Sequence, residues 1–251
     1  MCTLTFIPKE KGYLAGMNRD ELLTREIALP PRVFVKNGVR AVYPRESSGG
    51  TWIACNSNGV LFALLNWNRA GRGSSSEKNK SRGAIIPELI DQRGSHGASR
   101  ALEGLDLSDI LPFRLIGIFE KEKTILEWRS NGNVLNFEGM DWAPKHWFSS
   151  SLSDRSAEEG RSMACAKAWH EPGAGEKEWL RNLHRSHVPA PGPFSVCVHR
   201  PDAATVSYTE VSCCEPQISM EYLGGNPCLK PGPDERASIT LAEPPSTLTL
   251  P

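Results

Sequence analysis

Alternating polar and apolar residues at the start of the chain predict a β-hairpin. Cys2 to Ile7 alternates as a half-buried strand does, and Gly12 to Met17 has the pattern of its partner strand. Pro8 to Lys11 supplies the bend between the two. Antiparallel pairing would therefore return the run Asn18-Arg19-Asp20-Glu21 to the edge of the sheet where Cys2 begins.

A second hairpin is predicted around the dipeptide Asn58-Gly59, a strong short-range turn signal. It joins a strand over Thr51 to Asn56 with an almost unbroken apolar strand over Val60 to Leu65, which implies burial on both faces. Asn66 follows where this strand surfaces. Its amide would be well placed to donate a hydrogen bond to a developing oxyanion, although an amide bonded to nearby backbone is the alternative.

The rest of the pattern predicts sheets covered by helices, an α+β layered fold. Helices are expected at 84–92, 98–105, 156–169 and 175–187, and further strands at 114–120, 124–129, 133–137, 194–199, 204–211 and 218–223. The third of these helices would open on the capping box Ser156-x-x-Glu159. A short helix is also expected over Leu22 to Ile27, stopped by the following prolines.

Length and composition fit a globular domain. The chain has 251 residues, of which 39% are hydrophobic and 23% charged. Proline and glycine dominate from Gly224 onward, so we expect a single domain over residues 1–228 and a Pro/Gly-rich C-terminal tail over 229–251.

The charge balance and the cysteines limit the kinds of binding partner and cellular compartment that the sequence supports. The 29 basic and 29 acidic residues balance, which argues against nucleic acid as the main partner and leaves a small molecule. No apolar run approaches the ~18 residues of a membrane span, and no secretory signal is visible. The seven cysteines are scattered without a C-x-x-C motif, which favours a reducing cytoplasm and indicates neither a zinc site nor a disulfide scaffold.

Cys2 is the candidate nucleophile. Removal of Met1 would leave a thiol and a free α-amine on one residue. Such an amine titrates near ~7.7–8, so it can serve as the general base for its own thiol. Two alternatives stay open: Cys2 has no role, and the run Asn18 to Glu21 is the capped start of a helix.

A metal site at His184 and His187 is a weaker candidate. The two residues are spaced i, i+3 on a predicted helix, but no third ligand is visible and the glutamate of a zinc-protease helix is missing. A surface pair at a helix end is the favoured interpretation. No metal and no cofactor are therefore expected.

Four sequence segments together resemble the NRDE family, also called the transport and Golgi organisation protein 2 family. They are Met-Cys-Thr, Gly-Met-Asn-Arg-Asp-Glu, Gly-Gly-Thr-Trp-Ile-Ala and Asn-Gly-Val-Leu-Phe-Ala-Leu-Leu-Asn. That family is similar to N-terminal-nucleophile hydrolases of the penicillin V acylase and bile-salt hydrolase type. The resemblance implies a four-layer αββα sandwich.

The resemblance also implies roles for particular residues. The catalytic residues would be Cys2 as nucleophile, Asp20 as partner of its amine and Asn66 as oxyanion donor. The substrate-binding residues would be Asn18, Arg19, Glu21, Trp67 and Ser150. The chain departs from the hydrolases at three places: Met17 stands near the position of an arginine, Ser150 stands where asparagine is usual, and 203–207 lack a late arginine.

Two functions follow as hypotheses. The first is a cysteine N-terminal-nucleophile hydrolase acting on a non-peptide linear amide or thioester. The alternative is a non-catalytic binding or trafficking protein for a hydrophobic anion, such as haem or an acyl-CoA or lipid. A structural or secretory-pathway factor without a small ligand is a third option.

Overall fold

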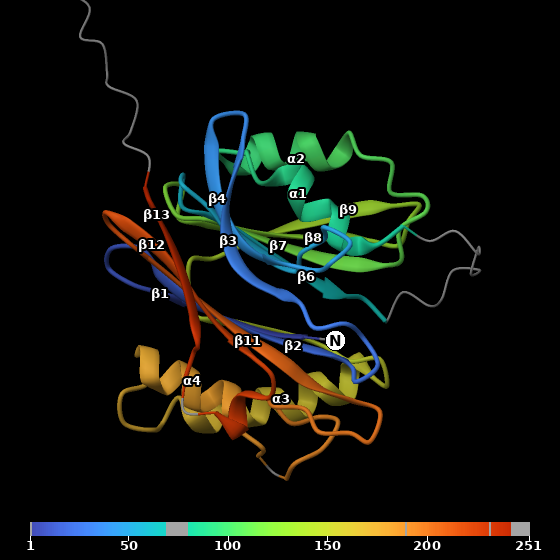
Figure 1. Ribbon diagram of the computed structural model, residues 1–251, viewed down its shortest axis with the longest axis vertical. Coiled ribbons are helices and arrows are strands. Elements are labelled where there is room, and N and C mark those ends of the chain that lie inside the picture. Colours follow the sequence, from blue (N-terminus) through green and yellow to red (C-terminus); the bar gives the residue numbers. More distant parts are fainter. Residues whose placement is uncertain (1, 69–79, 189, 231, 242–251) are drawn as a thin grey trace, which may run out of the picture.

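Two antiparallel β-sheets face one another in the computed structural model, which describes residues 2–68, 80–188, 190–230 and 232–241 (Figure 1). Leu4 and Phe6 from one sheet and Leu61 and Leu65 from the other belong to a single buried cluster between the sheets. The two sheets and their few helices confirm the predicted α+β sandwich.

The first sheet has six strands and contains the N-terminal hairpin. Its spatial order is β10 (Lys145–Ser149), β1 (Cys2–Pro8), β2 (Tyr13–Leu22), β11 (Ala203–Cys214), β12 (Gln217–Gly224) and β13 (Glu235–Thr240). The predicted hairpin is confirmed, because β1 pairs antiparallel with β2 and Cys2 lies opposite Arg19. β1 and β2 are therefore both interior strands of this sheet.

The second sheet has seven strands in sequence order. They are β3 (Leu29–Lys36), β4 (Val39–Arg45), β5 (Ile53–Asn56), β6 (Val60–Asn66), β7 (Phe113–Phe119), β8 (Thr124–Ser130) and β9 (Leu135–Met140). The predicted turn at Asn58-Gly59 is confirmed, with Gly59 at a φ of 79°, and joins β5 to β6.

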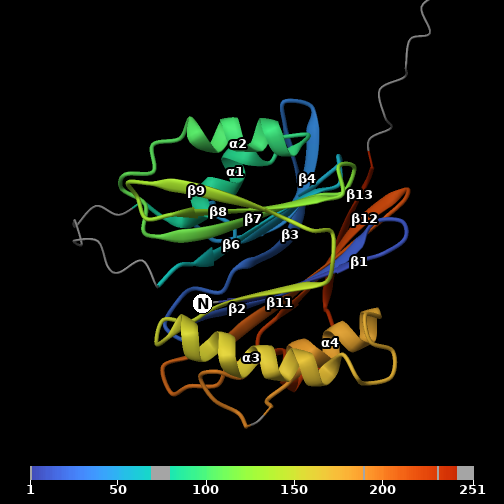
Figure 2. The same cartoon turned by 180° about the vertical axis from the view of Figure 1, so that it is seen from behind.

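Helices pack on the outer faces of both sheets (Figure 2). Outside the seven-stranded sheet lie η1 (Arg82–Ala84), α1 (Ile85–Leu89) and α2 (Ser95–Glu103), whose Ile86 and Leu102 are fully buried. Outside the six-stranded sheet lie α3 (Asp154–Ala168), α4 (Lys177–Arg185) and the short η2 (Pro227–Leu229). Ala164 of α3 and Leu180 of α4 pack there against β1 and β2.

Alternation along β1 and β2 assigns each side chain to one of two environments. Odd-numbered residues of β2, from Tyr13 to Met17, join the cluster between the sheets, and Arg19 continues that face. Even-numbered residues face the α3–α4 side, where Leu14 packs and where Asn18 and Asp20 also make their contacts. Neighbours in the run Asn18 to Glu21 are therefore separated by the thickness of the sheet.

Several predicted elements differ from the structure. Residues 22–27 form the end of β2 and a turn instead of a helix, and 194–199 form only isolated bridges. α3 begins one turn earlier than predicted, because the Ser153 hydroxyl accepts a hydrogen bond from the Ser156 amide and so caps the helix.

The predicted tail contains a strand. Residues 235–240 form β13, which pairs antiparallel with β12 and buries Ile239 against the core between the sheets. The structure thus differs from the tail prediction in this part, and residues 242–251 lie outside the described residues. Among the helices in the described parts of the chain, none is long and apolar enough to cross a bilayer.

Candidate active site

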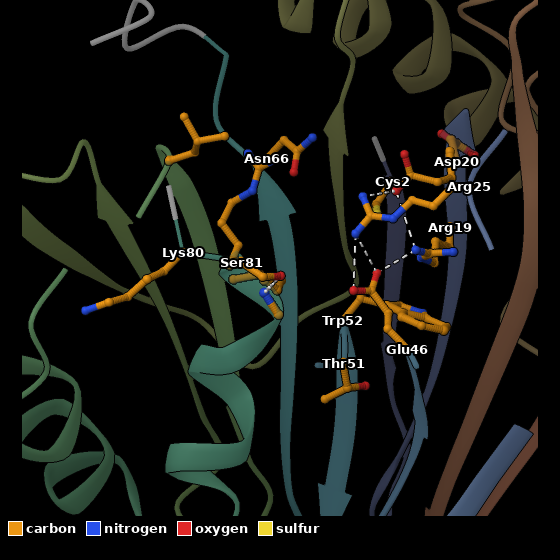
Figure 3. A pocket seen from close by; sticks show the side chains of 15 residues that line it. Cys2, Arg19, Asp20, Arg25, Glu46, Thr51, Trp52, Asn66, Lys80 and Ser81 are labelled. Atoms are coloured by element: carbon orange, nitrogen blue, oxygen red, sulfur yellow. Dashed lines mark hydrogen bonds and ion pairs between the residues drawn. The ribbon is translucent and has the colours of Figure 1, made fainter. Parts of the chain in front are cut away.

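A cavity of about 300 Å³ opens beside Cys2, where β1 begins and β2 approaches its end (Figure 3). Both sheets contribute to its walls, and the short segment before α1 closes one side. The lining residues are Cys2, Arg19, Asp20, Glu21, Arg25, Glu46, Thr51, Trp52, Leu64, Asn66, Lys80, Ser81, Arg82, Gly83 and Leu111. We call this cavity the Cys2 pocket.

Cys2 is buried, with only 6% of the residue exposed. Burial raises its pKa above the ordinary value, and the negative charge of Asp20 acts in the same direction while Arg19 opposes it. The thiol is therefore protonated near neutral pH, and a base is needed to make it nucleophilic. The Cys2 backbone nitrogen donates a hydrogen bond of 3.0 Å to Ser149 Oγ.

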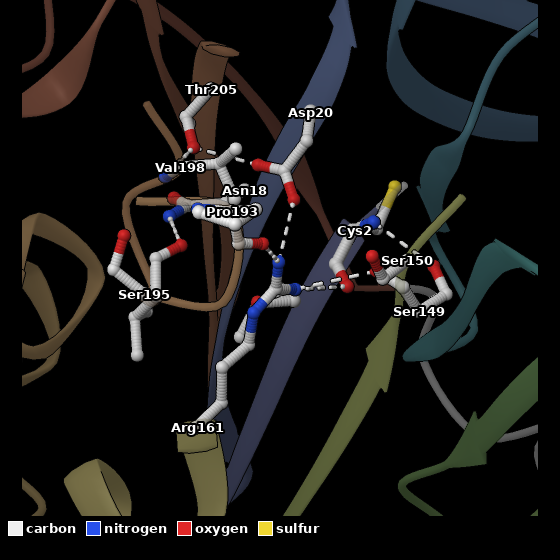
Figure 4. Close-up of polar contacts among 12 residues, drawn as sticks. Cys2, Asn18, Asp20, Ser149, Ser150, Arg161, Pro193, Ser195, Val198 and Thr205 are labelled. Carbon is white, nitrogen blue, oxygen red and sulfur yellow. Dashed lines mark hydrogen bonds and ion pairs between the residues drawn. The ribbon is translucent and has the colours of Figure 1, made fainter. Parts of the chain in front are cut away.

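Asp20 is fully buried on the helix-facing side of β2 (Figure 4). Its Oδ1 accepts a hydrogen bond of 2.6 Å from the Thr205 hydroxyl, and its Oδ2 lies 3.5 Å from Arg161 Nη2. Burial raises the Asp20 pKa, whereas the Arg161 charge and the Thr205 hydrogen bond lower it. Register and alternation place this carboxylate near the backbone of Cys2, across the sheet from its thiol.

Arg161 on α3 contacts both the start of β1 and Asp20 of β2 from the helix side of the sheet. Its Nη1 donates to the Cys2 carbonyl at 3.2 Å and to the Thr3 hydroxyl at 2.8 Å, while Nη2 faces Asp20. The residue is fully buried on α3. Sequence reasoning missed it, although a signal existed: Arg161 occupies the apolar stripe of the helix between Ala157 and Ala164.

Arg19 reaches the Cys2 pocket from the other face of β2. Its guanidinium lies 4.6 Å from the centre of the Trp52 ring and donates to Glu46 Oε1 at 2.6 Å. Arg25 bonds both Glu46 and Glu21, so two arginines and two carboxylates form one network at the rim. Glu21 is part of this network and also lines the pocket.

Of the other predicted site residues, one lines the Cys2 pocket and three do not. Asn66 ends β6 and lines the Cys2 pocket, across from Cys2. Trp67 and Ser150 are not among the lining residues; the Ser150 amide donates to Asp154 Oδ1 at the start of α3. Asn18 is fully buried on the other side of the sheet, where its amide donates to the His184 and Val196 carbonyls at 2.9 Å.

Arg82 is a second pocket residue that sequence reasoning did not select. It opens η1, lines the Cys2 pocket and donates to the Pro112 carbonyl at 3.2 Å. Burial lowers its pKa, and the nearby Cys2 and Glu21 groups act in the opposite direction. The pocket lining therefore combines the guanidinium groups of Arg19, Arg25 and Arg82 with the carboxylates of Asp20, Glu21 and Glu46.

A larger cavity of about 610 Å³ adjoins the first one. The two share Arg19, Glu21 and Arg25, so the ion-pair network at the rim lies between them. Leu22, Leu23, Ile27, Ala28 and Pro30 supply much of the apolar wall. We call this cavity the apolar pocket.

Three solved structures are similar to the chain. A mutant conjugated bile acid hydrolase from Clostridium perfringens superposes with a TM-score of 0.51 at 11% identity, covering 95% of this chain and 92% of that one. A further variant of that hydrolase gives 0.51 at 10% identity, covering 96% and 97%. A penicillin V acylase from Agrobacterium tumefaciens gives 0.47 at 11% identity, covering 89% and 86%.

Comparison with sequence families is more specific. No curated protein matches the chain at a significant level. Residues 1–174, which include both strands of the N-terminal hairpin and all the residues predicted for the site, match the family described as Transport and Golgi organisation 2. The resemblance noted in the sequence is thus confirmed, and the chain belongs to the Transport and Golgi organisation 2 family.

Proposed function

We propose that Cys2, made N-terminal by removal of Met1, is the nucleophile of a hydrolase acting on a non-peptide linear amide or thioester. The observation that carries the proposal is the pairing of Cys2 with Arg19 at a pocket, with Asp20 brought beside the Cys2 backbone. Met1 itself lies outside the described residues. The fold similarity to the bile acid hydrolase supports the same chemistry, and the four-layer αββα arrangement belongs to this proposal.

In the first half-reaction, Cys2 Sγ attacks the carbonyl carbon of the substrate, and the thiol proton passes to the α-amine of the same residue. The Asn66 amide donates to the oxyanion that develops. As the C–N bond breaks, the ammonium returns its proton to the leaving nitrogen. A thioester then links the acyl group to Cys2.

In the second half-reaction, water attacks the thioester carbonyl while the α-amine accepts the water proton. The C–S bond breaks, the proton returns to sulfur and the carboxylic acid leaves. Asp20 orients the amine in both steps, and Arg161 with Thr205 fixes Asp20. Ser149 Oγ, 3.0 Å from the Cys2 nitrogen, is a second partner for that amine.

The apolar pocket indicates the substrate class. An acyl chain seated against Leu23 and Ile27 would present its carbonyl to Cys2 across the rim of the two cavities. Arg19 or Arg82 would hold an anionic group of the leaving part. All seven cysteines are free thiols, which fits a reducing compartment such as the cytoplasm.

The experiment is hydrolysis of a panel of acyl amides and acyl thioesters by processed wild-type protein and by variants. Cys2→Ala should lower the rate at least ~100-fold, because the nucleophile is gone. Asp20→Asn should lower it about 100-fold through loss of amine orientation. Cys214→Ser, which changes an exposed thiol far from the pocket, should retain the wild-type rate. Equal rates in Cys2→Ala and wild type would overturn the proposal.

One observation favours the alternative function, a carrier of a hydrophobic anion. The apolar pocket has about twice the volume of the Cys2 pocket, and arginines line their shared rim. A carrier would bind an acyl-CoA or haem saturably, equally well in wild type and Cys2→Ser, and would release it unchanged. Turnover dependent on Cys2 excludes this alternative.

A further inference from the structure

Four metal-ligating side chains meet on the helix-covered side of the six-stranded sheet, away from the Cys2 pocket. They are His187, Cys197, His199 and Cys228, and their ligand atoms all lie within 4.8 Å of one another. Three chain segments supply them: the residues after α4, the segment before β11, and η2. Sequence analysis expected no zinc site because these residues lack a compact motif, and only the fold brings them together.

The expected histidine pair is split by the structure. His184 is fully buried on α4, where its Nε2 lies 3.0 Å from the Thr5 hydroxyl, so the prediction of a surface pair is wrong for this residue. His187 lies beyond the end of the helix, and its Nε2 is 3.0 Å from His199 Nε2. The spacing i, i+3 therefore selected one true member of the cluster and one residue outside it.

Three distances, all from His199 Nε2 to the other ligand atoms, lie close to those between ligands of a tetrahedral zinc site. Bond lengths of ~2.0–2.1 Å to nitrogen and ~2.3 Å to sulfur require edges of about 3.3 Å between nitrogens and about 3.6 Å between nitrogen and sulfur. The two histidine nitrogens are 3.0 Å apart. His199 Nε2 lies 3.8 Å from Cys197 Sγ and 3.5 Å from Cys228 Sγ.

We propose that His187, Cys197, His199 and Cys228 bind one Zn²⁺ in a closed Cys₂His₂ site. Two thiolates and two imidazoles form a donor set typical of structural zinc, and four protein ligands leave no position for substrate. Burial is graded: Cys197 is buried, whereas the other three are partly exposed and give the ion a path from solvent.

Asn226 lies beside the four ligands. Its Oδ1 is 3.2 Å from Cys197 Sγ and 3.0 Å from Cys228 Sγ, and it accepts from both thiols. Binding of the ion would displace these two thiol protons into solvent, since the thiolate is the ligand. Zinc affinity should therefore fall as pH is lowered.

A bound zinc ion would hold together the chain segments whose hydrogen bonds position Asp20. The Cys197 amide donates to the Ser186 carbonyl at 3.0 Å, which holds the segment before β11 against the end of α4. In the same segment, the Val198 amide donates to Thr205 Oγ1 at 2.8 Å, and Thr205 donates to Asp20. Zinc would thus tie η2 and α4 to the residues that position Asp20.

The test uses the full chain without an affinity tag, reduced and stripped of metal by a chelator, then titrated with Zn²⁺ or Co²⁺. We expect one equivalent of either ion per chain, a rise in melting temperature, and the cobalt absorption of a tetrahedral site with thiolate ligands. Cys197→Ser and Cys228→Ser should each weaken zinc binding by more than ~100-fold. Loss of a residue that only hydrogen-bonds a metal ligand costs ~10–100-fold, so a larger loss identifies a direct ligand. Cys214→Ser and Cys165→Ser should bind like wild type.

Wild-type titration decides the question even if the ligand variants fold poorly. No binding of Co²⁺ or Zn²⁺ by the reduced wild-type chain would overturn the proposal. Equal losses of metal affinity in Cys214→Ser and Cys197→Ser would also overturn it. A disulfide between Cys197 and Cys228 in protein purified under reducing conditions would do the same.

Discussion

At the scale of single residues, Arg161 is the buried cation beside Asp20 in the proposed catalytic site. It and Asp20 are both fully buried, at a depth where an unpaired charge is costly. The same guanidinium also bonds the Cys2 carbonyl and the Thr3 hydroxyl. Its removal would take a buried cation away from the carboxylate and a hydrogen-bond donor away from the start of β1.

Arg161→Leu should therefore lower the free energy of unfolding by about 3–5 kcal/mol. Arg155→Leu on the same helix is the matched control, since Arg155 is largely exposed and pairs with Glu159. The control should leave the free energy of unfolding almost unchanged, because an exposed ion pair contributes little to stability. Urea denaturation of both variants checks this, and comparable losses in the two would contradict the proposed support.

Strand alternation alone divides the predicted site residues into two groups. Arg19 and Glu21 lie on the pocket side of β2, whereas Asn18 and Asp20 make their hydrogen bonds on the helix side. Asp20 also lines the Cys2 pocket. Of the four residues in this run, Arg19, Asp20 and Glu21 line the Cys2 pocket and Asn18 does not. Asp20 lies one residue beyond the Cys2–Arg19 pair, close to the end of β2.

At the scale of elements, the β1–β2 hairpin sets the register that joins Cys2 to Asp20. Its bend depends on Gly12, which has a φ of +99°. A Cβ there would lie 1.7 Å from the Cys213 carbonyl oxygen of β11. The turn is therefore packed directly against the strand on the other side of β2.

Gly12→Ala should destabilise the protein by more than ~3 kcal/mol, because the clash involves backbone that cannot rotate away. Gly38→Ala is the control: it has a φ of +75° but no atom within 4 Å of the added Cβ. It should cost about 1–2 kcal/mol, the strain of a left-handed residue alone. Thermal unfolding distinguishes the two, and equal costs would refute the packing argument.

Local signals predicted the hairpins well and the caps and edges less well. Alternation, the bend at Pro8 to Lys11 and the turn signal Asn58-Gly59 are properties of adjacent residues, so they can be read from the sequence. The strand β13 depends on its pairing with β12 and on burial of Ile239 between the sheets. The α3 cap at Ser153 is a local bond to the Ser156 amide, and the capping-box pattern starting at Ser156 placed the helix start too late. The proposed zinc site could not be predicted from local signals either, because its four ligands are spread over residues 187 to 228.

At the scale of the whole molecule, a buried polar chain links the six-stranded sheet to its helices. Thr5 Oγ1 lies 3.0 Å from both His184 Nε2 and His146 Nδ1, and Trp169 Nε1 donates to His146 Nε2. Burial lowers the pKa of His184 to about 3 and of His146 to about 4. Both imidazoles are therefore neutral in the folded protein.

These two histidines should make stability decrease with acid. Below their ordinary pKa of 6.5 the unfolded chain takes up protons, while the folded chain does not until about pH 4. The free energy of unfolding should fall by up to ~1.4 kcal/mol per pH unit for each histidine. His184→Gln should remove about half of this dependence in urea denaturation between pH 6 and 4; an unchanged slope would contradict it.

The central claim is that Cys2 acts as an N-terminal nucleophile, and the mass of the N-terminal peptide tests it most directly. Protein that hydrolyses an acyl amide should yield a peptide beginning at Cys2, with a fraction carrying the acyl group during turnover. A fully active preparation whose N-terminal peptide retains Met1 would contradict the account.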